Sequence, residues 1–316
     1  MKRPQTYEII DEAADFLCKT DNMLDGALRP TAATRCGNQA ALMGARRSYF
    51  LGEIDMIRLT HVLRRRLGMS LQEFRSYLSN THGPLVMRYS TLLRIRKYVQ
   101  VYTIDDPANE ELRNSRGGEK AYDGVQEIWW DSRQDILNAM TSADGQEATR
   151  VLVDDEKNFI DLKHSPGWFG YEVPQINPVP ENIIATEKSP LVKLYYVLHH
   201  LPNQSIEDAQ FYWRVYHGPK VRQYAHAHRP LRYIQVHRLE DELDRMFSDV
   251  RGTGPPLYYG HAELWFDRVE LAAGLTTPEG VKAAQVFIED EKTFIDLSRS
   301  AIWLAKEQVF IDRIEG

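Results

Sequence analysis

The chain has 316 residues, of which 43% are hydrophobic and 27% charged, a balance typical of globular proteins and a length sufficient for two domains. Its net charge of −6 argues against a general nucleic-acid-binding protein, which usually carries a basic face. With only Cys18 and Cys36, and no apolar run near the roughly 18 residues of a membrane span, we expect a cytoplasmic protein without a membrane or nucleic-acid partner.

Residues 1–55 have no counterpart in the rest of the chain, and we expect them to be an accessory arm or to reflect a mis-assigned start. The part that follows begins with a strand. Strand-like segments in the first half cover residues 56–64, 96–103, 124–130 and 168–173.

Two helical segments separate these strands. Ser70 is followed three residues later by Glu73, a capping box that predicts the start of the first helix. We expect this helix to end at His82, because Pro84 follows two residues later. The second helix begins near Ser132. The order βαββαβ is the ferredoxin-like motif, whose sheet carries helices on one face only.

The second half repeats the first. Ser205 and His217 stand 135 residues after Ser70 and His82, and the intervening segments align without a gap. A period of this length is the size of a domain. We therefore predict a leader at 1–55, a first repeat at 56–173, a Pro-rich linker at 174–190 and a second repeat at 191–316. The bare face of each sheet needs a cover, and the sheet of the other repeat is the obvious one.

Short motifs occur in the same order in both halves. In the second half they are His217-Gly218-Pro219, Tyr233-Ile234-Gln235, Tyr259-Gly260 with Glu263, Trp265 and Asp267, and Phe294-Ile295-Asp296-Leu297. With these motifs the chain resembles a tandem EthD-domain protein. The resemblance implies the dimeric α+β barrel superfamily, α+β in class, in which two ferredoxin-like sheets face each other around a cavity. In a tandem protein the two copies can form that barrel within one chain.

The resemblance specifies the fold but not the reaction, because the superfamily contains enzymes with several different reactions. The superfamily includes muconolactone isomerase, polyketide cyclases, cofactor-free monooxygenases, aldoxime dehydratase and haem-degrading enzymes. Fungal EthD-like proteins include decarboxylases of aromatic polyketides.

Strand alternation suggests which face lines a cavity. In the second strand, aliphatic Val99 and Val101 alternate with a mixed row of polar and aromatic residues. We expect the aliphatic rows to pack against helices and the mixed rows to line a pocket between the sheets. The mixed rows contain Tyr98, Gln100, Glu127, Trp129, Tyr233, Gln235, His237, His261, Glu263 and Trp265. The alternative is that these polar groups pair with one another and only hold the interface together.

The candidate catalytic groups come from these rows and from the His-Gly-Pro motifs. A carboxylate inside an apolar barrel must pair with a donor or shift its pKa upward, which would make Glu127 or Glu263 an acid or base near neutral pH. His82 and His217 are further candidates, because histidine is the residue type most often used for acid–base chemistry near neutral pH, although a helix C-terminal histidine that contacts carbonyl groups is the alternative. We expect Glu263, which has the imidazole of His261 nearby, to matter more than Glu127.

The other six candidates are expected to orient the substrate together with His237: Tyr233, Gln235, Trp265, Tyr98, Gln100 and Trp129. No cofactor motif occurs, and His226-Ala227-His228 and His199-His200 are best explained without a metal.

The sequence therefore predicts a cofactor-independent enzyme that acts on a small apolar, aromatic or cyclic metabolite by acid–base chemistry, as a lyase, dehydratase, decarboxylase or isomerase. The alternatives are an O₂-using or haem-linked monooxygenase and a non-catalytic ligand-binding accessory protein. A homo-oligomer is also possible.

Overall fold

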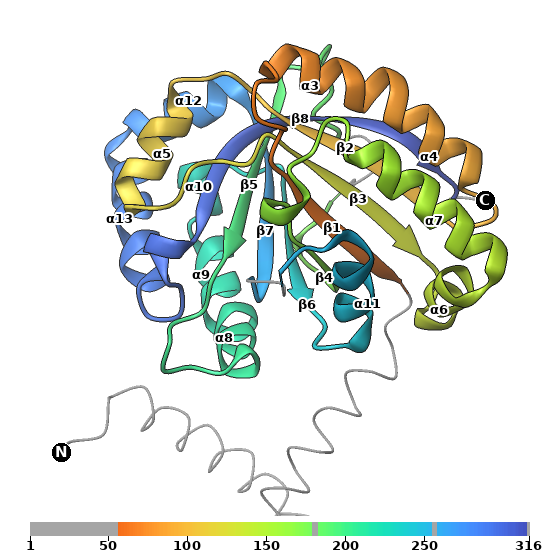
Figure 1. Cartoon of the computed structure of the whole chain (residues 1–316). Helices are drawn as coiled ribbons and strands as arrows, with labels where there is room; N and C mark the ends of the chain where they lie inside the picture. The colour runs from red at the N-terminus through yellow and green to blue at the C-terminus, as the bar shows by residue number, and fades with distance from the viewer. Residues whose placement is uncertain (1–55, 179–182, 255–257, 315–316) are drawn as a thin grey trace, which may run out of the picture. The chain divides into compact units, whose positions relative to one another are not determined.

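The computed structural model describes residues 56–178, 183–254 and 258–314, and the expected arm at 1–55 lies outside them. The described residues form a closed antiparallel barrel of eight strands (Figure 1). The first repeat supplies β1 (Ile57–Leu63), β2 (Lys97–Thr103), β3 (Gly124–Trp130) and β4 (Gly167–Ile176). The second supplies β5 (Leu191–Leu198), β6 (Arg232–Arg238), β7 (Gly260–Asp267) and β8 (Ala301–Asp312).

The strand order around the barrel is β1-β3-β2-β8-β5-β7-β6-β4. Each repeat keeps the ferredoxin-like order, with its last strand beside its first. The two sheets join where β2 pairs with β8 and where β4 pairs with β6. The prediction that two facing sheets close a barrel within one chain is therefore confirmed.

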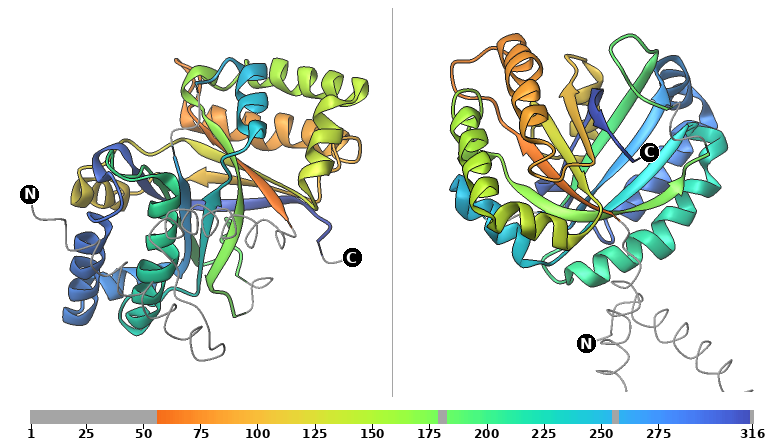
Figure 2. Two further views of the ribbon diagram at one scale, coloured as in Figure 1. Left: turned by 90° about the horizontal axis from the view of Figure 1, so that it is seen from below. Right: turned by 90° about the vertical axis from the view of Figure 1, so that its right-hand side faces the viewer.

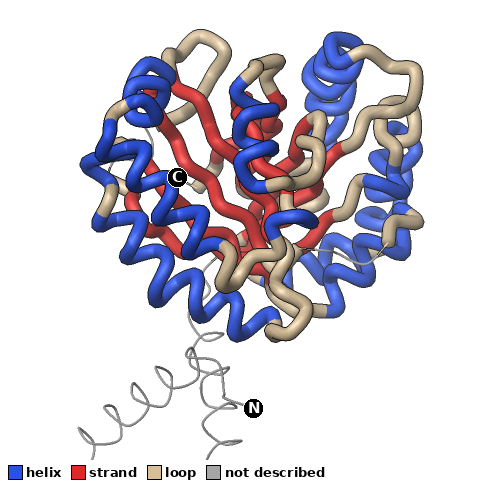
Figure 3. The backbone as a smooth tube through the Cα atoms, turned by 90° about the vertical axis from the view of Figure 1, so that its left-hand side faces the viewer, coloured by secondary structure: helices blue, strands red, loops and turns tan. Residues whose placement is uncertain are grey.

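The helices lie on the outside of the barrel (Figures 2 and 3). In the first repeat they are α3 (Leu71–Tyr77), α4 (Gly83–Tyr89), α6 (Arg133–Thr141) and α7 (Ala143–Glu156). In the second they are α8 (Ile206–Tyr212), α9 (Gly218–Gln223), α10 (Ala225–His228), α12 (Arg268–Thr276) and α13 (Pro278–Glu291). None of these described helices is long and apolar enough to cross a membrane.

The barrel interior is packed with large side chains from both repeats. Trp129 and Trp265 are 7% and 3% exposed, which agrees with the prediction that they are buried between the sheets. Trp168 and Trp303 are fully buried in the same layer, beside Val99. Separate apolar cores lie under the helices of each repeat.

The predicted orientation of the second strand is wrong. Val99 pairs with Glu127 and Gln100 with Gln126, and side chains at paired positions point to the same face. Val99 therefore faces the barrel interior with Glu127, while Tyr98 and Gln100 face the helices. The same holds for Tyr233, Gln235 and His237 on β6. The polar row is stable there because it bonds to the helix layer: Gln100 Nε2 donates to the Leu78 carbonyl at 2.8 Å.

The first helix does not end at the histidine. A π-helical segment, Leu78–His82, joins α3 to α4, and Trp213–His217 joins α8 to α9 in the same way. Pro84 is tolerated because it stands in the first turn of α4, where a missing N–H costs little. Each histidine therefore lies within a continuous helix, at a π segment of the kind that often marks functional sites.

Two helices between the second and third strands of the repeats were missed by the sequence interpretation. They are α5 (Ala108–Arg116) and α11 (Glu242–Arg251), and each ends at a left-handed glycine. α5 leaves the first repeat and packs on β8 of the second, beside α12 in Figure 1. α11 leaves the second repeat and packs on β4 of the first. Each repeat thus covers part of the other.

Candidate functional site

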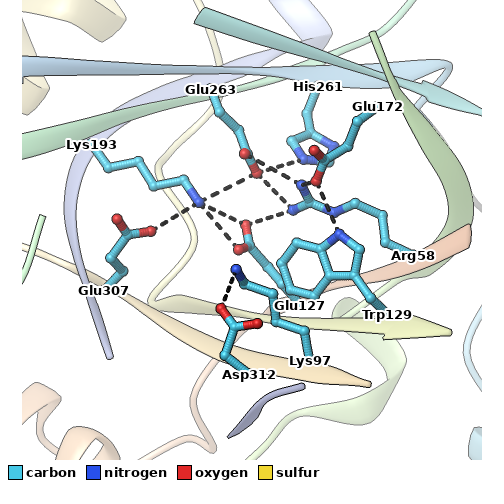
Figure 4. A network of polar contacts seen from close by, with 10 residues as sticks. All are labelled: Arg58, Lys97, Glu127, Trp129, Glu172, Lys193, His261, Glu263, Glu307 and Asp312. Atoms are coloured by element: carbon cyan, nitrogen blue, oxygen red, sulfur yellow. Dashed lines mark hydrogen bonds and ion pairs between the residues drawn. The ribbon is translucent and has the colours of Figure 1, made fainter. Parts of the chain in front are cut away.

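The barrel interior holds a buried network of ion pairs that joins the two repeats (Figure 4). Arg58 on β1 and Lys193 on β5 occupy matching positions and supply its positive charges. The Arg58 guanidinium lies 2.7 Å from carboxylate oxygens of both Glu127 and Glu263. Lys193 Nζ lies 3.0 Å from Glu127 and 3.4 Å from Glu263. Each central carboxylate therefore contacts one cation from each half.

Two outer carboxylates complete the network with the same near-symmetry. Glu172 on β4 accepts hydrogen bonds from Arg58 and from Trp129 Nε1, both at 3.0 Å. Glu307 on β8 accepts from Trp265 Nε1 at 2.7 Å. The carboxylates and indoles of the third strands are therefore paired with polar groups on β1, β5, β4 and β8, which favours the alternative that they hold the interface together.

The surroundings shift the pKa values of the two central carboxyl groups in opposite directions. Burial and the neighbouring charge of Glu263 raise the pKa of Glu127 to about 8. Burial alone would also raise the pKa of Glu263, but Arg58 and Lys193 lower it well below its ordinary range. Burial lowers the pKa of His261 to about 4, so the neutral ring donates from Nε2 to Glu263 Oε1 at 3.1 Å. We therefore assign a proton near neutral pH to Glu127 rather than to Glu263.

Glu127, His261 and Glu263 also offer ligand atoms that lie within 4.8 Å of one another, a spacing compatible with a metal ion. Arg58 and Lys193 already contact both carboxylates, and His261 already donates to Glu263. A metal ion would have to displace these cations. The three residues therefore fit an ion-pair network better than a metal centre.

A cavity of about 360 Å³ lies on the other face of the second repeat's strands, between them and the helices. The strands contribute the apolar side chains Leu194, Ala262, Leu264, Phe266, Ile302 and Leu304. α5, which comes from the first repeat, contributes Ala108, Leu112 and Arg116. The cavity therefore needs both repeats, and its volume and apolar wall suit a small apolar molecule.

His217 reaches this cavity from the π-helical segment. Its Nδ1 lies 2.7 Å from Asp290 Oδ2, and none of the described residues forms a hydrogen bond with its Nε2. Asp290 also accepts from the Tyr212 hydroxyl at 2.8 Å and contacts Lys220. Burial alone would raise the pKa of Asp290, but the hydrogen bonds from these three groups lower it to about 2. A permanent carboxylate thus fixes the ring of His217 and leaves Nε2 available to a ligand.

The matching histidine of the first repeat, His82, has both ring nitrogens occupied. Nδ1 lies 2.8 Å from Asp155 Oδ2, and Nε2 lies 3.0 Å from Oε1 of Gln126. Gln126 on β3 corresponds to Ala262 on β7, because the two residues pair with the matching glutamines Gln100 and Gln235. The second repeat therefore lacks the side chain that blocks the histidine of the first.

The helix-side space of the first repeat is also filled by larger side chains. Leu243 and Phe247 on α11 are 0% and 2% exposed in the core of the first repeat. The matching residues of α5 are Ala108 and Leu112, which line the cavity of the second repeat. Smaller side chains therefore open in the second repeat a space that is packed in the first.

A second polar group in the cavity wall joins the repeats. Arg116 donates from Nε to Oε2 of Glu291 at 2.8 Å and from Nη2 to Oε1 at 3.0 Å. The Tyr196 hydroxyl lies 3.4 Å from Glu291 Oε2. The pair Arg251–Glu156 forms the same contact in the first repeat. Because Glu291 neutralises Arg116, this arginine offers no free charge to an acidic ligand.

The structure separates residues that the sequence grouped as one catalytic set. His217 and Tyr233 line the cavity, whereas His261 and Glu263 lie in the barrel interior. These side chains cannot meet, because neighbouring positions along β7 point to opposite faces and Ala262 is the one that faces the cavity. The catalytic roles given to His261 and Glu263 stay predictions.

The remaining predicted residues fall into three groups. Glu127, Trp129 and Trp265 belong to the interior network. His82, Tyr98 and Gln100 lie in the helix layer of the first repeat. His82 and Tyr98 both bond to Gln126, and Gln100 donates to the Tyr98 hydroxyl. Gln235 and His237 lie behind Tyr233: Gln235 Nε2 donates to the Tyr233 hydroxyl, and His237 bonds to Gln235 Oε1.

Four residues that build this site were missed: three line the cavity, and Asp290 holds His217, although the repeat carried a signal for each. Asp290 and Glu291 open the repeated Asp-Glu-Lys segment. Arg116-Gly117 recurs 135 residues later as Arg251-Gly252. Ala262 stands out only when the two copies are compared with each other, since it replaces Gln126.

Comparison with known proteins identifies the family. The EthD domain model matches residues 66–163 and again residues 201–298, and the two matches together cover more than half of the chain. The chain therefore belongs to the EthD domain family, and it carries two copies of the domain. A search of curated proteins found no match.

The chain is also similar, at low identity, to several solved structures. An ethyl tert-butyl ether degradation (EthD) family protein from Bacillus halodurans C-125 is 19% identical, with a TM-score of 0.28, over 37% of this chain and 99% of its own. An anthrone oxidase-like protein is 8% identical, with a TM-score of 0.49, over 83% and 96% of the two chains. A chlorite dismutase variant from Candidatus Nitrospira defluvii is 9% identical, with a TM-score of 0.40, over 80% and 91%.

Replacing Glu127 by Gln tests the interior network. A carboxyl pKa that rises from an ordinary 4.5 to about 8 on folding means that the folded chain binds more protons between these values. The free energy of unfolding contributed by Glu127 therefore falls as pH rises through this window. We expect Glu127→Gln to flatten the dependence of the free energy of unfolding on pH between about pH 4.5 and pH 8, measured by urea denaturation.

Glu263→Gln is the matched control, because it removes the charge that Arg58 and Lys193 share. We expect this variant to lose about 3–5 kcal/mol at neutral pH, the usual cost of breaking a buried ion pair by removing one partner. Equal pH slopes in wild type and Glu127→Gln would contradict the assignment of the proton to Glu127.

Proposed function

We propose that the cavity of the second repeat is the active site of an enzyme that moves protons on a small apolar ring compound. The observation that carries this proposal is the state of His217. Its Nδ1 is held by a buried carboxylate while its Nε2 has no partner among the described residues, inside an apolar cavity. The reaction type is a lyase, dehydratase, decarboxylase or isomerase step.

The geometry supports general acid–base catalysis by His217. The Asp290 carboxylate accepts a hydrogen bond from Nδ1–H, which fixes the tautomer and stabilises the ring when it becomes positively charged. Nε2 is then the atom that takes a proton from the substrate or returns one. The apolar wall limits competing contact with water and strengthens each electrostatic interaction inside.

The aromatic and aliphatic wall supports a ring-shaped, mostly apolar substrate. Phe266, Phe287 and Trp213 lie around the cavity with several leucines. Flat rings gain favourable contact with such walls, and only a few polar groups are needed to orient them. The cytoplasmic location and the homo-oligomer remain predictions of the sequence.

His217 and His82 give a matched pair of variants. We expect His217→Ala to lower kcat about 10²–10⁴-fold, the usual range for loss of a general acid or base. His82→Ala should leave kcat within about tenfold, because His82 is bonded to Gln126 and Asp155. The measurement is turnover of a panel of bicyclic and tricyclic ketones, lactones and phenols, followed by mass spectrometry.

The same pair separates catalysis from stability. His82→Ala should lower the free energy of unfolding by about 1–3 kcal/mol, because it leaves buried partners without hydrogen bonds. A panel compound that binds tightly but is never converted would support a ligand-binding accessory protein instead. Oxygen uptake during turnover would support a monooxygenase.

Ala262→Gln is expected to block the cavity from within. A glutamine at this position on β7 can form the hydrogen bond to His217 Nε2 that Gln126 forms to His82. We expect activity to fall at least 100-fold while the melting temperature stays level or rises, measured by the same assay and by thermal unfolding. Ala262→Ser, which keeps the side chain small, should retain most activity. Full turnover by a folded Ala262→Gln variant would contradict the placement of the active site.

A further inference from the structure

In the first repeat the side-chain oxygen of Gln126 occupies the position that is open cavity in the second repeat, where Ala262 replaces Gln126. Oε1 of Gln126 accepts a hydrogen bond from the Tyr98 hydroxyl at 2.8 Å and one from His82 Nε2 at 3.0 Å. Two donors, one phenol and one imidazole, therefore converge on a single amide carbonyl oxygen.

The donor roles in the first repeat are fixed by the surrounding bonds. Gln100 Nε2 donates to the backbone carbonyl of Leu78 at 2.8 Å, which sets the direction of its amide group. The same nitrogen donates to the Tyr98 hydroxyl at 2.6 Å. The Tyr98 hydroxyl therefore directs its own proton to Gln126.

The second repeat has the same arrangement of glutamine and tyrosine, but it lacks the acceptor that Gln126 provides in the first. Gln235 Nε2 donates to the Trp213 carbonyl and to the Tyr233 hydroxyl, both at 3.0 Å. Trp213 Nε1 also donates to the Tyr233 hydroxyl at 3.0 Å. The Tyr233 oxygen thus accepts two hydrogen bonds, and its own proton has no acceptor among the described residues. Burial raises the pKa of Tyr233 above its ordinary value, so the proton is retained.

We propose that an oxygen atom of the bound molecule takes the place of Gln126 Oε1, between the Tyr233 hydroxyl and His217 Nε2. The ligand class is an apolar ring compound that carries a carbonyl oxygen, such as a cyclic ketone, quinone or lactone. This inference rests on the proposed function, since it names the group that the same cavity recognises. The Tyr233 hydroxyl donates to this oxygen, and His217 Nε2 becomes a second donor once it has taken up a proton, so both groups stabilise negative charge that develops there during proton transfer.

The charges around the cavity favour a neutral carbonyl over a carboxylate. Arg116 is neutralised by Glu291, and burial lowers the pKa of His228 in the wall to about 4, so that ring is uncharged. An anionic ligand would find no unpaired permanent cation among the described cavity residues.

The experiment compares two probes of nearly equal shape, 9-fluorenone and fluorene, which differ by the carbonyl oxygen. Binding to the full chain is followed by quenching of tryptophan fluorescence. We expect fluorenone to bind about tenfold more tightly, the upper end of the gain expected from one buried hydrogen bond donated by Tyr233. Tyr233→Phe should bring the ratio of the two affinities close to one while fluorene affinity stays within about twofold.

The matched control is Tyr98→Phe, which removes the corresponding hydroxyl in the first repeat and should leave the ratio unchanged. Infrared spectroscopy gives a second measurement: the carbonyl stretch of bound fluorenone should move to lower wavenumber, and move less in Tyr233→Phe. Equal affinities for both probes, or a ratio that persists in Tyr233→Phe, would refute the oxygen site and leave the proposed function standing. Binding of neither probe would overturn both.

Discussion

Closure of the barrel depends on the last strand of each repeat, which pairs with one strand from each half. β4 lies between β1 and β6, and β8 lies between β5 and β2. A repeat by itself would leave unpaired backbone groups at both edges of its sheet and an uncovered inner face. Pairing removes both edges, and the facing sheet covers the inner face. The buried cations on β1 and β5 are tolerable only inside the closed barrel, because the carboxylates that contact Arg58 and Lys193 come from both repeats.

The composition of the cavity follows from this strand pairing. Because β2 is hydrogen-bonded to β8, the helix that follows β2 lies over the second repeat rather than its own. α5 thereby places Leu112 and Arg116 in the wall of a cavity whose floor belongs to β5, β6, β7 and β8. The reciprocal pairing of β4 with β6 carries α11 onto the first repeat, where Phe247 fills the corresponding space. In both repeats the helix that follows the second strand lies over the other repeat. The same arrangement thus produces an open site in the second repeat and a packed one in the first.

The sequence was sufficient for the fold because its evidence there was redundant. Both copies carry the capping box or N-cap serine, the His-Gly-Pro motif and the repeated Asp-Glu-Lys segment, so the ferredoxin-like elements were marked twice, whereas α5 and α11 carried no such motif. The orientation of β2 was not readable, because Tyr98 and Gln100 are polar and buried on the helix side. Alternation shows which residues share a face, but only the register with a neighbour, Gln100 opposite Gln126, shows which face that is. The π segment likewise depends on packing, since His-Gly-Pro by itself indicates a helix end.

The cavity was hidden from motif analysis for a different reason, since the decisive residue is a plain alanine. In a symmetric dimer of single domains, every substitution appears in both sites, so a side chain that blocks one site blocks the other. Two copies in one chain remove this constraint. Gln126 can satisfy His82 and Tyr98 and so stabilise the first half, while Ala262 leaves His217 and Tyr233 without that acceptor in the second. The buried donors of the second half are costly unless a ligand or water bonds to them. A ligand oxygen would recover this free energy on binding. The chain tolerates the cost in the second repeat because the corresponding donors of the packed first repeat already have hydrogen-bond partners.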